Sequence, residues 1–450
     1  MQYLNKKIAI LGLGLESIDL LDWLKKNSKN CSITIFDIRE EIEDLGGNDY
    51  SFSLGKDYLK NGLTHFDVIF RSPGFYRLNP ELLKAERLGV EITSPTKLFF
   101  KLCQAKIIGV TGTKGKGTTT TLINRILKTS GQKSYIAGNI GKPALNLLDK
   151  LTSKDWVCLE LSSFQLQDLD ISPHIAIVLN ITSEHLDVHQ TTQEYRQAKL
   201  NLITHQKKSD KVILNADFEF TKELTKLTPA KTYFFSRQKK VNGCYVENNQ
   251  ILLNIDDQIA TIGQADSLLL RGAHNRENIT AAIIAAFLAG ADLESINQAV
   301  FSFKGLKHRL QLIKEVKGIT FYNDSFSTTP ETAIAALRSF SEPMTIILGG
   351  SNKGSDYTIL GQEIAKTINL VNIILIGEMA GEIKKAIKKA GYPKAKIIYK
   401  PRNMTKIVNF AFKASQKGDV VVLSPACASF DMFKNYKDRG DQFIKAVNHL

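Results

Sequence analysis

Short apolar runs alternate with amphipathic stretches along almost the whole chain. The runs have the length of strands and end at glycine or polar residues, as at 8–14 (IAILGLG), 107–117 (IIGVTGTKGKG), 156–161 (WVCLEL) and 345–350 (TIILGG). Continuous apolar strands that alternate with helices predict parallel sheets covered on both faces, and therefore an α/β fold. Ligands of such sheets bind at the carboxyl ends of the strands, so these ends are the expected places for chemistry.

Two breaks divide this pattern into three predicted domains. The first falls at Ser94-Pro95 and the second at Lys304-Gly305, which gives domains at 1–94, 95–304 and 305–450. We expect Rossmann-like outer domains and a central P-loop ATPase-like domain with a parallel sheet. Within the central domain, short strands and turns at 230–265 predict a small β-rich appendage.

Charge is the unusual feature of the composition. Lys plus Arg number 59 and Asp plus Glu number 45, which gives a formal net charge of +14. A nucleic acid, an anionic small substrate or a lysine-rich solvated surface would each explain the excess. Because the lysines are dispersed and no basic run is interleaved with aromatic residues, we expect no nucleic-acid partner.

Other bulk features favour an ordinary cytoplasmic protein. No apolar run approaches the ~18 residues that cross a bilayer, and the start does not have the pattern of a signal peptide. The five cysteines are scattered and form no CxxC pair. We therefore expect reduced thiols, no membrane partner and a monomer.

The first strand ends in a glycine turn, Gly12-Leu13-Gly14-Leu15-Glu16-Ser17, which approximates GxGxxG with Ser17 at the third glycine. Asp37 ends the next strand, where a dinucleotide fold places its ribose-binding acid. Three interpretations stay open here: an NAD(P) dehydrogenase, a nucleotide-like ligand on the helix N-terminus, or a tight turn that needs glycine for its backbone. A second loop, 71–75 (RSPGF), would line the same crevice.

The sharpest local signal is the loop at 111–120 (TGTKGKGTTT), between an apolar strand and a helix-like stretch. Glycines let backbone amides turn toward phosphate oxygens, Lys116 supplies charge, and the Thr118 hydroxyl can reach Mg²⁺. The match to GxxxxGK[ST] is imperfect, since Val110 and Gly117 replace the first glycine and the Ser/Thr. We expect nucleotide phosphates to bind Gly112, Thr113, Lys114, Gly115, Lys116, Gly117, Thr118 and Thr119.

Polar residues also follow two further strands. Glu160 ends a strand near this loop, where it would either bind Mg²⁺ or cap the next turn. His185 follows another strand and is either a structural histidine or a second metal ligand. Lys199 lies in a helix-like segment and, by itself, is a surface lysine.

Together with further motifs in the same order, these segments resemble the Mur ligases. The motifs include ELSSFQ at 160–165, YRQAK at 195–199, GAHN at 272–275, GLKHR at 305–309, NDS at 323–325 and LSPACAS at 423–429. The likeness spans nearly the whole chain, and its two ends point to the glutamate-adding members. The phosphate loop alone would also admit a folylpolyglutamate synthetase.

The resemblance implies an ATP-dependent carboxylate–amine ligase of cytoplasmic peptidoglycan precursor synthesis. ATP would activate the carboxylate of UDP-N-acetylmuramoyl-L-alanine as an acyl phosphate, which the glutamate amine would attack. D-glutamate is the expected acceptor and L-glutamate the alternative. A dehydrogenase would explain only residues 12–37, and a basic P-loop protein would leave the third domain without a role.

The resemblance also assigns residues. Thr118, Glu160, His185 and a carbamylated Lys199 would hold Mg²⁺, expected as two ions, and Lys116, Glu160, His185 and Lys199 would serve catalysis. Asn275, Arg309 and Asp324 would bind ATP. The UDP-linked substrate would contact Leu15, Glu16, Asp37, Arg39, Ser72, Gly74, Asn139 and His185, and the glutamate would contact Thr328, Lys353, Ser429, Phe430 and Tyr436.

One position departs from the family pattern. The glutamate-adding members usually show Lys-Ala-Thr-Asn after Asn323-Asp324-Ser325, whereas this chain continues with Phe326-Ser327-Thr328-Thr329. At the position where the family pattern has a lysine near the glutamate, this chain therefore has Phe326. Because burying an anion without a partner is costly, we expect Lys353 and hydroxyl donors to hold the glutamate instead.

Overall fold

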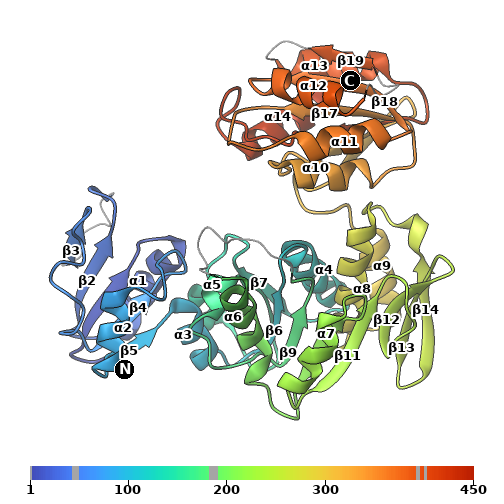
Figure 1. Ribbon diagram of the computed structural model, residues 1–450. Coiled ribbons are helices and arrows are strands. Elements are labelled where there is room, and N and C mark those ends of the chain that lie inside the picture. The colour runs from blue at the N-terminus through green and yellow to red at the C-terminus, as the bar shows by residue number, and fades with distance from the viewer. Residues whose placement is uncertain (1–2, 43–49, 182–190, 392–395, 400–402) are drawn as a thin grey trace. The chain divides into compact units, whose positions relative to one another are not determined.

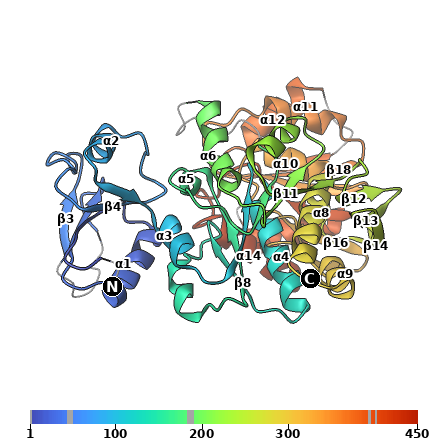
Figure 2. The same cartoon turned by 90° about the horizontal axis from the view of Figure 1, so that it is seen from below.

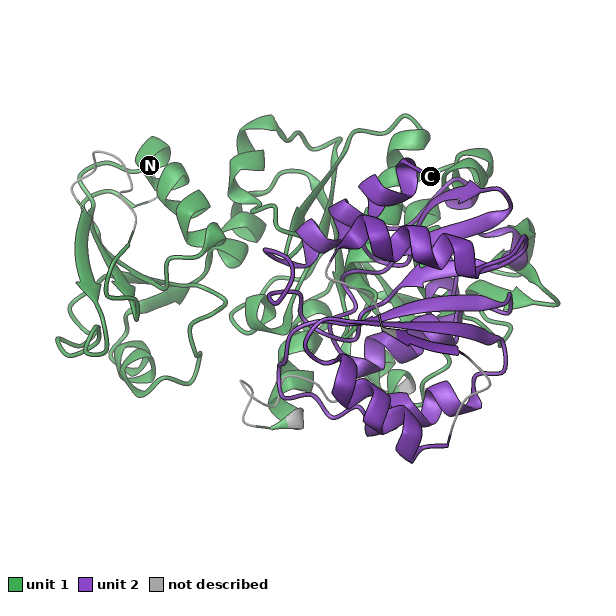
Figure 3. Cartoon of the chain, turned by 90° about the horizontal axis from the view of Figure 1, so that it is seen from above, with its two compact units in different colours: residues 1–264, 277–299 green, residues 265–276, 300–450 purple. Residues whose placement is uncertain are grey.

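The computed structural model describes residues 3–42, 50–181, 191–391, 396–399 and 403–450. Within these residues lie three sheets, one in each of the predicted segments (Figure 1). The chain forms two compact units, residues 1–264 with 277–299 and residues 265–276 with 300–450 (Figure 3). The α/β class is confirmed, while the boundaries at 94 and 304 stay predictions.

The N-terminal sheet is parallel throughout. Its described strands follow the order β3-β2-β1-β4-β5, which is the Rossmann order 3-2-1-4-5-6 without its sixth strand. Along β1, Ile8 and Ile10 enter one core while Ala9 and Leu11 enter another, which explains the unbroken apolar run. The elements are β1 (Lys7–Leu11), α1 (Leu15–Asn27), β2 (Ser32–Asp37), β3 (Tyr50–Leu54), β4 (Val68–Arg71), α2 (Pro80–Arg87) and β5 (Glu91–Thr93).

Helix α3 (Pro95–Leu102) leads from the first sheet to the second. The Ser94 hydroxyl accepts from the Lys97 N–H, and Pro95 holds the first helical position, so the sequence specifies where the helix begins. Helices α1 and α3 lie side by side (Figures 1 and 2). Both contact the 3-10 turn η1 (Leu145–Lys150). Their apolar side chains join one core that extends into both sheets, which accounts for the single unit.

The central sheet has the described order β14-β13-β12-β11-β10-β9-β6-β8-β7 and is parallel from β7 to β12. Its first half comprises β6 (Lys106–Thr111), α4 (Lys116–Thr129), β7 (Ser134–Gly138), β8 (Trp156–Glu160), α5 (Ser163–Leu166), β9 (Ile175–Val178) and α6 (Thr192–Thr204). Then follow β10 (Lys211–Asn215), α7 (Phe220–Leu224), η2 (Thr225–Leu227), β11 (Lys231–Ser236), β12 (Gly243–Glu247), β13 (Gln250–Ile255), β14 (Gln258–Gln264), α8 (Ala273–Leu288) and α9 (Leu293–Phe301).

The stretch at 230–265 is rich in strands, as predicted. These strands continue the central sheet and do not form a separate appendage. Strands β11 and β12 extend the parallel part, and β13 and β14 add an antiparallel hairpin to its edge. Asn248 and Asn249 form the tight turn, with φ of 45° and 63°. Gly243 begins β12, where a Cβ would lie 1.7 Å from the Phe234 carbonyl oxygen, so no larger residue fits.

The C-terminal sheet has the described order β15-β16-β20-β17-β18-β19, in which only the pairing of β15 with β16 is antiparallel. Successive residues such as Ile346 and Ile347 enter opposite cores. After η3 (Ala265–Ser267), this unit contains β15 (Gln311–Val316), β16 (Ile319–Asn323), α10 (Pro330–Leu337), β17 (Met344–Gly349), α11 (Thr358–Lys366), β18 (Leu370–Ile376), α12 (Ala380–Lys389), β19 (Lys396–Tyr399), α13 (Met404–Ala414), β20 (Val420–Leu423) and α14 (Tyr436–Asn448).

Two bulk expectations can be compared with the structure. All five cysteines are free thiols. Among the described residues, every helix is too short or too polar to pass through a lipid bilayer.

Candidate functional site

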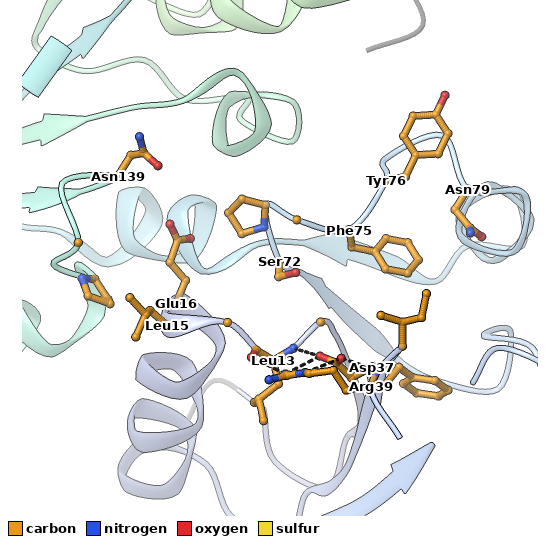
Figure 4. A pocket seen from close by; sticks show the side chains of 18 of the residues that line it. Leu13, Leu15, Glu16, Asp37, Arg39, Ser72, Phe75, Tyr76, Asn79 and Asn139 are labelled. Carbon is orange, nitrogen blue, oxygen red and sulfur yellow. Dashed lines mark hydrogen bonds and ion pairs between the residues drawn. The ribbon is translucent and has the colours of Figure 1, made fainter. Parts of the chain in front are cut away.

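A pocket of about 740 Å³ opens at the carboxyl ends of β1, β2 and β4 (Figure 4). Asn139, in the loop after β7, lines its far side, so the pocket lies between the first two sheets of one unit. Every described residue that the resemblance assigned to the UDP-linked substrate lines it: Leu15, Glu16, Asp37, Arg39, Ser72, Gly74 and Asn139. His185, the remaining one, lies outside the described residues.

The glycine turn shapes the floor of this pocket. Gly12 has a φ of +83°, and a Cβ there would lie 2.4 Å from the Ser72 hydroxyl oxygen, so only glycine lets the two loops approach. The Ser17 hydroxyl donates to the Gly12 carbonyl oxygen at 2.7 Å. A serine at the third position of the fingerprint thus closes the turn through its side chain.

Asp37 and Arg39 form a fixed pair at the pocket floor (Figure 4). The Asp37 carboxylate accepts from Arg39 Nε at 2.8 Å, from Arg39 Nη2 at 2.7 Å and from the Leu13 N–H at 2.8 Å. These bonds, above all those from Arg39, hold the pKa of Asp37 well below its usual range. Asp37 therefore orients Arg39, and its oxygens are already engaged where a dinucleotide ribose would need them.

The Glu16 carboxylate connects the two sheets. It accepts from the Gln165 side-chain amide and, at 3.3 Å, from the Thr96 hydroxyl. Burial raises the pKa of Glu16, although both hydrogen bonds oppose that shift. Gln165 in turn forms a capping box with Ser162 at the start of α5, so the ELSSFQ segment is tied to the first sheet.

Several lining residues escaped the sequence analysis. They include Tyr58, Tyr76, Asn79, Lys142 and Pro143. Lys142 follows Gly141 in the same loop as Asn139, and a lysine beside a glycine turn was the available signal. No local pattern marks the other four.

The phosphate loop joins β6 to α4, as predicted. Gly115 precedes the helix with a φ of +88°, and a Cβ there would lie 2.1 Å from Asn278 Oδ1, so the loop requires glycine. Lys116 Nζ donates to the carbonyl oxygens of Gly112 at 3.0 Å and Thr113 at 3.1 Å. Thr118 and Thr119 are buried in the first turn of α4, Gly117 lies beside them, and Lys114 is exposed.

Lys199 reaches the same loop from α6. Its side chain is almost completely buried, and Nζ donates to the Gly112 carbonyl oxygen at 3.0 Å. The ring of Tyr195 lies 4.6 Å from that amine, and the Tyr195 hydroxyl is 3.1 Å from Thr113 Oγ1. From its local sequence alone, Lys199 was expected on the surface. The fold instead brings it to the phosphate loop.

Glu160 ends β8 directly beside the strand that feeds the loop, since Val110 of β6 pairs with it. Its Oε1 accepts from Asn139 Nδ2 at 3.0 Å, which links the pocket to the central sheet. The Glu160 carboxylate and Thr118 hydroxyl are hard oxygen donors of the kind Mg²⁺ prefers. Among the described residues there is no group of three or more His, Cys, Asp or Glu that could hold a metal.

In the second unit, Asp324 follows β16 and lies among hydroxyl and amide donors. It accepts from Ser327 Oγ, from Ser424 Oγ at 2.8 Å and from the Leu310 N–H at 2.9 Å. Burial raises its pKa to about 6, against the lowering effect of these bonds and of Arg309. Asn275, also assigned to ATP, is buried at the start of α8, where its side chain donates to the Arg271 carbonyl oxygen at 2.6 Å.

An aromatic stack occupies the position of the missing lysine. Arg309 lies 3.8 Å from the centre of the Phe326 ring, and Tyr436 meets that ring edge-on at 5.1 Å. Lys353 and Phe430 are exposed, with Lys353 Nζ 5.9 Å from the Phe430 ring. Ser429 is buried and Thr328 half-buried, both in loops at the carboxyl ends of adjacent strands, β20 and β16.

Arg439 was not singled out from the sequence, yet it is fully buried behind this region. It donates to Ser325 Oγ at 2.9 Å and to the carbonyl oxygens of Cys427 and Ala428 at 3.1 Å. It thereby ties the loop after β16 to the loop after β20. These bonds explain why a charged residue stands inside a helix face that otherwise packs on the core.

Comparison with known proteins agrees with the geometry. The Mur ligase middle domain matches residues 110–286, and the Mur ligase glutamate ligase domain matches residues 308–427. The UDP-N-acetylmuramoylalanine–D-glutamate ligase of Acetivibrio thermocellus is 38% identical, over 99% of this chain and 97% of that protein. The chain belongs to the Mur ligase family. It is therefore an ATP-dependent amide ligase of peptidoglycan precursor synthesis, which removes the dehydrogenase alternative.

Solved structures give the same fold for this Mur ligase. The UDP-N-acetylmuramate-alanine ligase MurC of Thermotoga maritima aligns with a TM-score of 0.59 at 18% identity, over 99% of each chain. The MurF ligase of Thermotoga maritima in complex with ADP aligns with a TM-score of 0.58 at 18% identity, over 100% of this chain and 96% of that one. At this identity the likeness concerns the fold alone.

Proposed function

We propose that this Mur ligase joins D-glutamate to UDP-N-acetylmuramoyl-L-alanine in the cytoplasm, with ATP as the energy source. One observation carries the proposal: seven residues from four separate segments, all assigned beforehand to the UDP-linked substrate, line a single pocket. The name of the Acetivibrio thermocellus relative supports the acceptor.

The reaction would proceed in two displacements. A substrate carboxylate oxygen attacks the γ-phosphorus of ATP, the bond to the β-phosphate oxygen breaks, and ADP leaves. The uncharged amine of glutamate then attacks the acyl carbon, the carbon–oxygen bond to the phosphate breaks, and inorganic phosphate leaves with the proton that the nitrogen loses as the amide forms. Because phosphoryl transfer needs mainly positioning and neutralisation of charge, the loop amides, the start of α4 and Lys116 suit the first step.

Bound Mg²⁺ would neutralise charge on the phosphates. The oxygen donors of Thr118 and Glu160 fit that ion, and His185 belongs to the proposed set through the family resemblance. Lys199 enters this set as a carbamate, formed when its neutral amine adds to CO₂ and loses a proton. Carbamylation leaves one N–H on the side chain, which can keep the bond to the Gly112 carbonyl oxygen.

Acceptor recognition belongs to the second unit in this proposal. Lys353, Ser429, Thr328, Phe430 and Tyr436 would surround glutamate, and Asn275, Arg309 and Asp324 would bind ATP. Phe326, which lies against Arg309, replaces a cation that the family pattern would place near the glutamate, so the acceptor pocket is rebuilt here and L-glutamate is kept as the alternative acceptor.

A phosphate-release assay tests the function. Phosphate should appear only when ATP, Mg²⁺, UDP-N-acetylmuramoyl-L-alanine and glutamate are all present, and omission of any one should abolish it. Release that requires L-glutamate would establish the alternative acceptor. Phosphate release in the absence of the UDP-linked substrate would contradict the proposal. So would a lack of release with both D-glutamate and L-glutamate.

A further inference from the structure

Arg71 ends β4 at the start of the 72–75 turn, and its own side chain does not line the substrate pocket. Its side chain is 1% exposed. Its guanidinium donates to Asp168 Oδ2 at 2.6 Å and to the Phe164 carbonyl oxygen at 2.6 Å, both in the segment around α5. It also donates to the Phe75 carbonyl oxygen at 2.8 Å. One buried cation therefore holds two loops from different sheets of the same unit.

Asp168 completes the arrangement. This carboxylate is 3% exposed and carries a second ion pair, from Arg77 Nε to Oδ1 at 2.8 Å. Arg77 in turn reaches Glu86 of α2 at 2.5 Å. Charges so deeply buried are costly unless their geometry is well satisfied, and removal of one partner leaves the other uncompensated. The cluster spans the seam along which the pocket opens, and loss of either Arg71 or Asp168 would leave a buried charge without its partner.

The turn held by this cluster is the one that faces the pocket. Residues Ser72, Gly74 and Phe75 line the cavity, while the carbonyl oxygens of Ser72 and Phe75 lie 3.3 Å and 2.8 Å from Arg71 Nη1. Two groups that would repel an anion are thus engaged by the guanidinium. In the described part of the chain, the Gly74 N–H donates to no protein acceptor, and such amides bind phosphate oxygens.

We propose that Arg71 and Asp168 are positioning residues for the UDP-linked substrate: they hold the 72–75 turn in the shape that binds its diphosphate. This inference rests on the proposed function. The ion pair acts through the turn and touches no reacting atom, so its loss should weaken substrate binding and leave nucleotide binding at the phosphate loop intact.

The test uses the full chain and two titrations by calorimetry, with UDP-N-acetylmuramoyl-L-alanine and with ADP–Mg²⁺. Arg71→Lys keeps the charge but cannot reach all its acceptors, and Asp168→Asn keeps the shape but removes the charge. Each should raise the Kd for the UDP-linked substrate by about tenfold, because small misplacements of positioning groups have effects of this size or larger. The Kd for ADP should change by less than about twofold.

Asp170→Asn is the matched control. Asp170 pairs with Lys97 at 2.8 Å across the same seam but does not touch the 72–75 turn, so both dissociation constants should stay at their wild-type values. If Asp168→Asn does not fold, as judged by circular dichroism, Arg71→Lys alone decides the question.

Folded variants that bind the UDP-linked substrate as tightly as wild type would overturn the positioning role. So would equal weakening of both ligands, which would indicate a general loosening of the unit. Failure of the wild-type protein to bind the UDP-linked substrate, with ADP still bound, would overturn the proposed function itself and this inference with it.

Discussion

Lys116 and Lys199 donate hydrogen bonds to the same carbonyl oxygen, that of Gly112, and both distances are 3.0 Å. The two lysines come from α4 and α6, 83 residues apart by their numbers (199 − 116). Two protonated amines on one oxygen repel each other, and the repulsion is stronger where water is excluded. A carbamate on the buried Lys199 would replace that repulsion by attraction, so the geometry supports the modification that the resemblance suggests.

Replacement of Lys116 should remove most of the catalytic rate. Lys116→Ala is expected to lower kcat by about 10²–10³-fold, the cost typical of a group that stabilises transition-state charge. Phosphate release measures this directly. The exposed Lys128, in the last turn of the same helix, gives the control variant Lys128→Ala, which should keep full activity. A Lys116→Ala protein with nearly wild-type turnover would remove the phosphate-loop lysine from the mechanism.

Lys199 should work only in its carbamylated form. Lys199→Ala is expected to lose most activity, and a short carboxylate such as formate should restore part of it by supplying the missing oxygen donors. Lys199→Arg keeps a cation but cannot form the carbamate, so it should be as inactive as Lys199→Ala. High activity in the arginine variant would show that a simple positive charge is sufficient.

The stack of Arg309 on Phe326 should hold the guanidinium for ATP. Phe326→Leu removes the ring and is expected to raise the KM for ATP by about two- to fivefold, which corresponds to the ~0.5–1 kcal/mol of an exposed cation–π contact. Phe326→Tyr keeps the ring and should behave as wild type. Steady-state kinetics with ATP varied distinguishes the two, and an unchanged KM in the leucine variant would show that the stack has no role in ATP binding.

Asp324 should make the stability of the second unit depend on pH. Its pKa is raised to about 6 by burial, whereas an unfolded aspartate titrates near ~3.9. Between these values the folded state keeps a proton that the unfolded state has lost, so the free energy of unfolding falls as pH rises through this window and then levels off.

Asp324→Asn removes this titration. Across the window from about pH 4 to about pH 6, the free energy of unfolding of wild type should fall by on the order of 2–3 kcal/mol relative to that of the variant. Thermal melting of both proteins in matched buffers measures the difference. If the difference in melting temperature between the two proteins is the same at every pH, Asp324 does not titrate in this range.

The sequence predicted the positions at strand ends because continuous apolar runs mark parallel strands and their carboxyl ends meet at one edge. The family resemblance assigned Leu15, Asp37, Ser72 and Asn139 to one site, and all four line one pocket. The β-rich stretch was expected from its turns. The sequence did not predict that β11 pairs in parallel with β10, since no local pattern reveals which strand becomes a neighbour.

Other parts of the site were inaccessible to sequence reasoning. The ion pair between Arg71 and Asp168 joins residues 97 positions apart, and each belongs to a segment that gives no sign of the other. Arg439 lies in an amphipathic helix where an arginine normally faces water, and only the tertiary structure shows it buried. Burial of Lys199 likewise follows from how α6 packs and not from its local sequence.

Mass spectrometry of the reaction product tests the central claim most directly. The purified protein is given ATP, Mg²⁺ and UDP-N-acetylmuramoyl-L-alanine with D-glutamate, L-glutamate, D-aspartate or meso-diaminopimelate in separate reactions. The account predicts a product heavier by one glutamyl residue with D-glutamate, formed together with one ADP and one phosphate. A product from L-glutamate alone would move the acceptor to the other isomer, and the absence of a product with either glutamate would contradict the account.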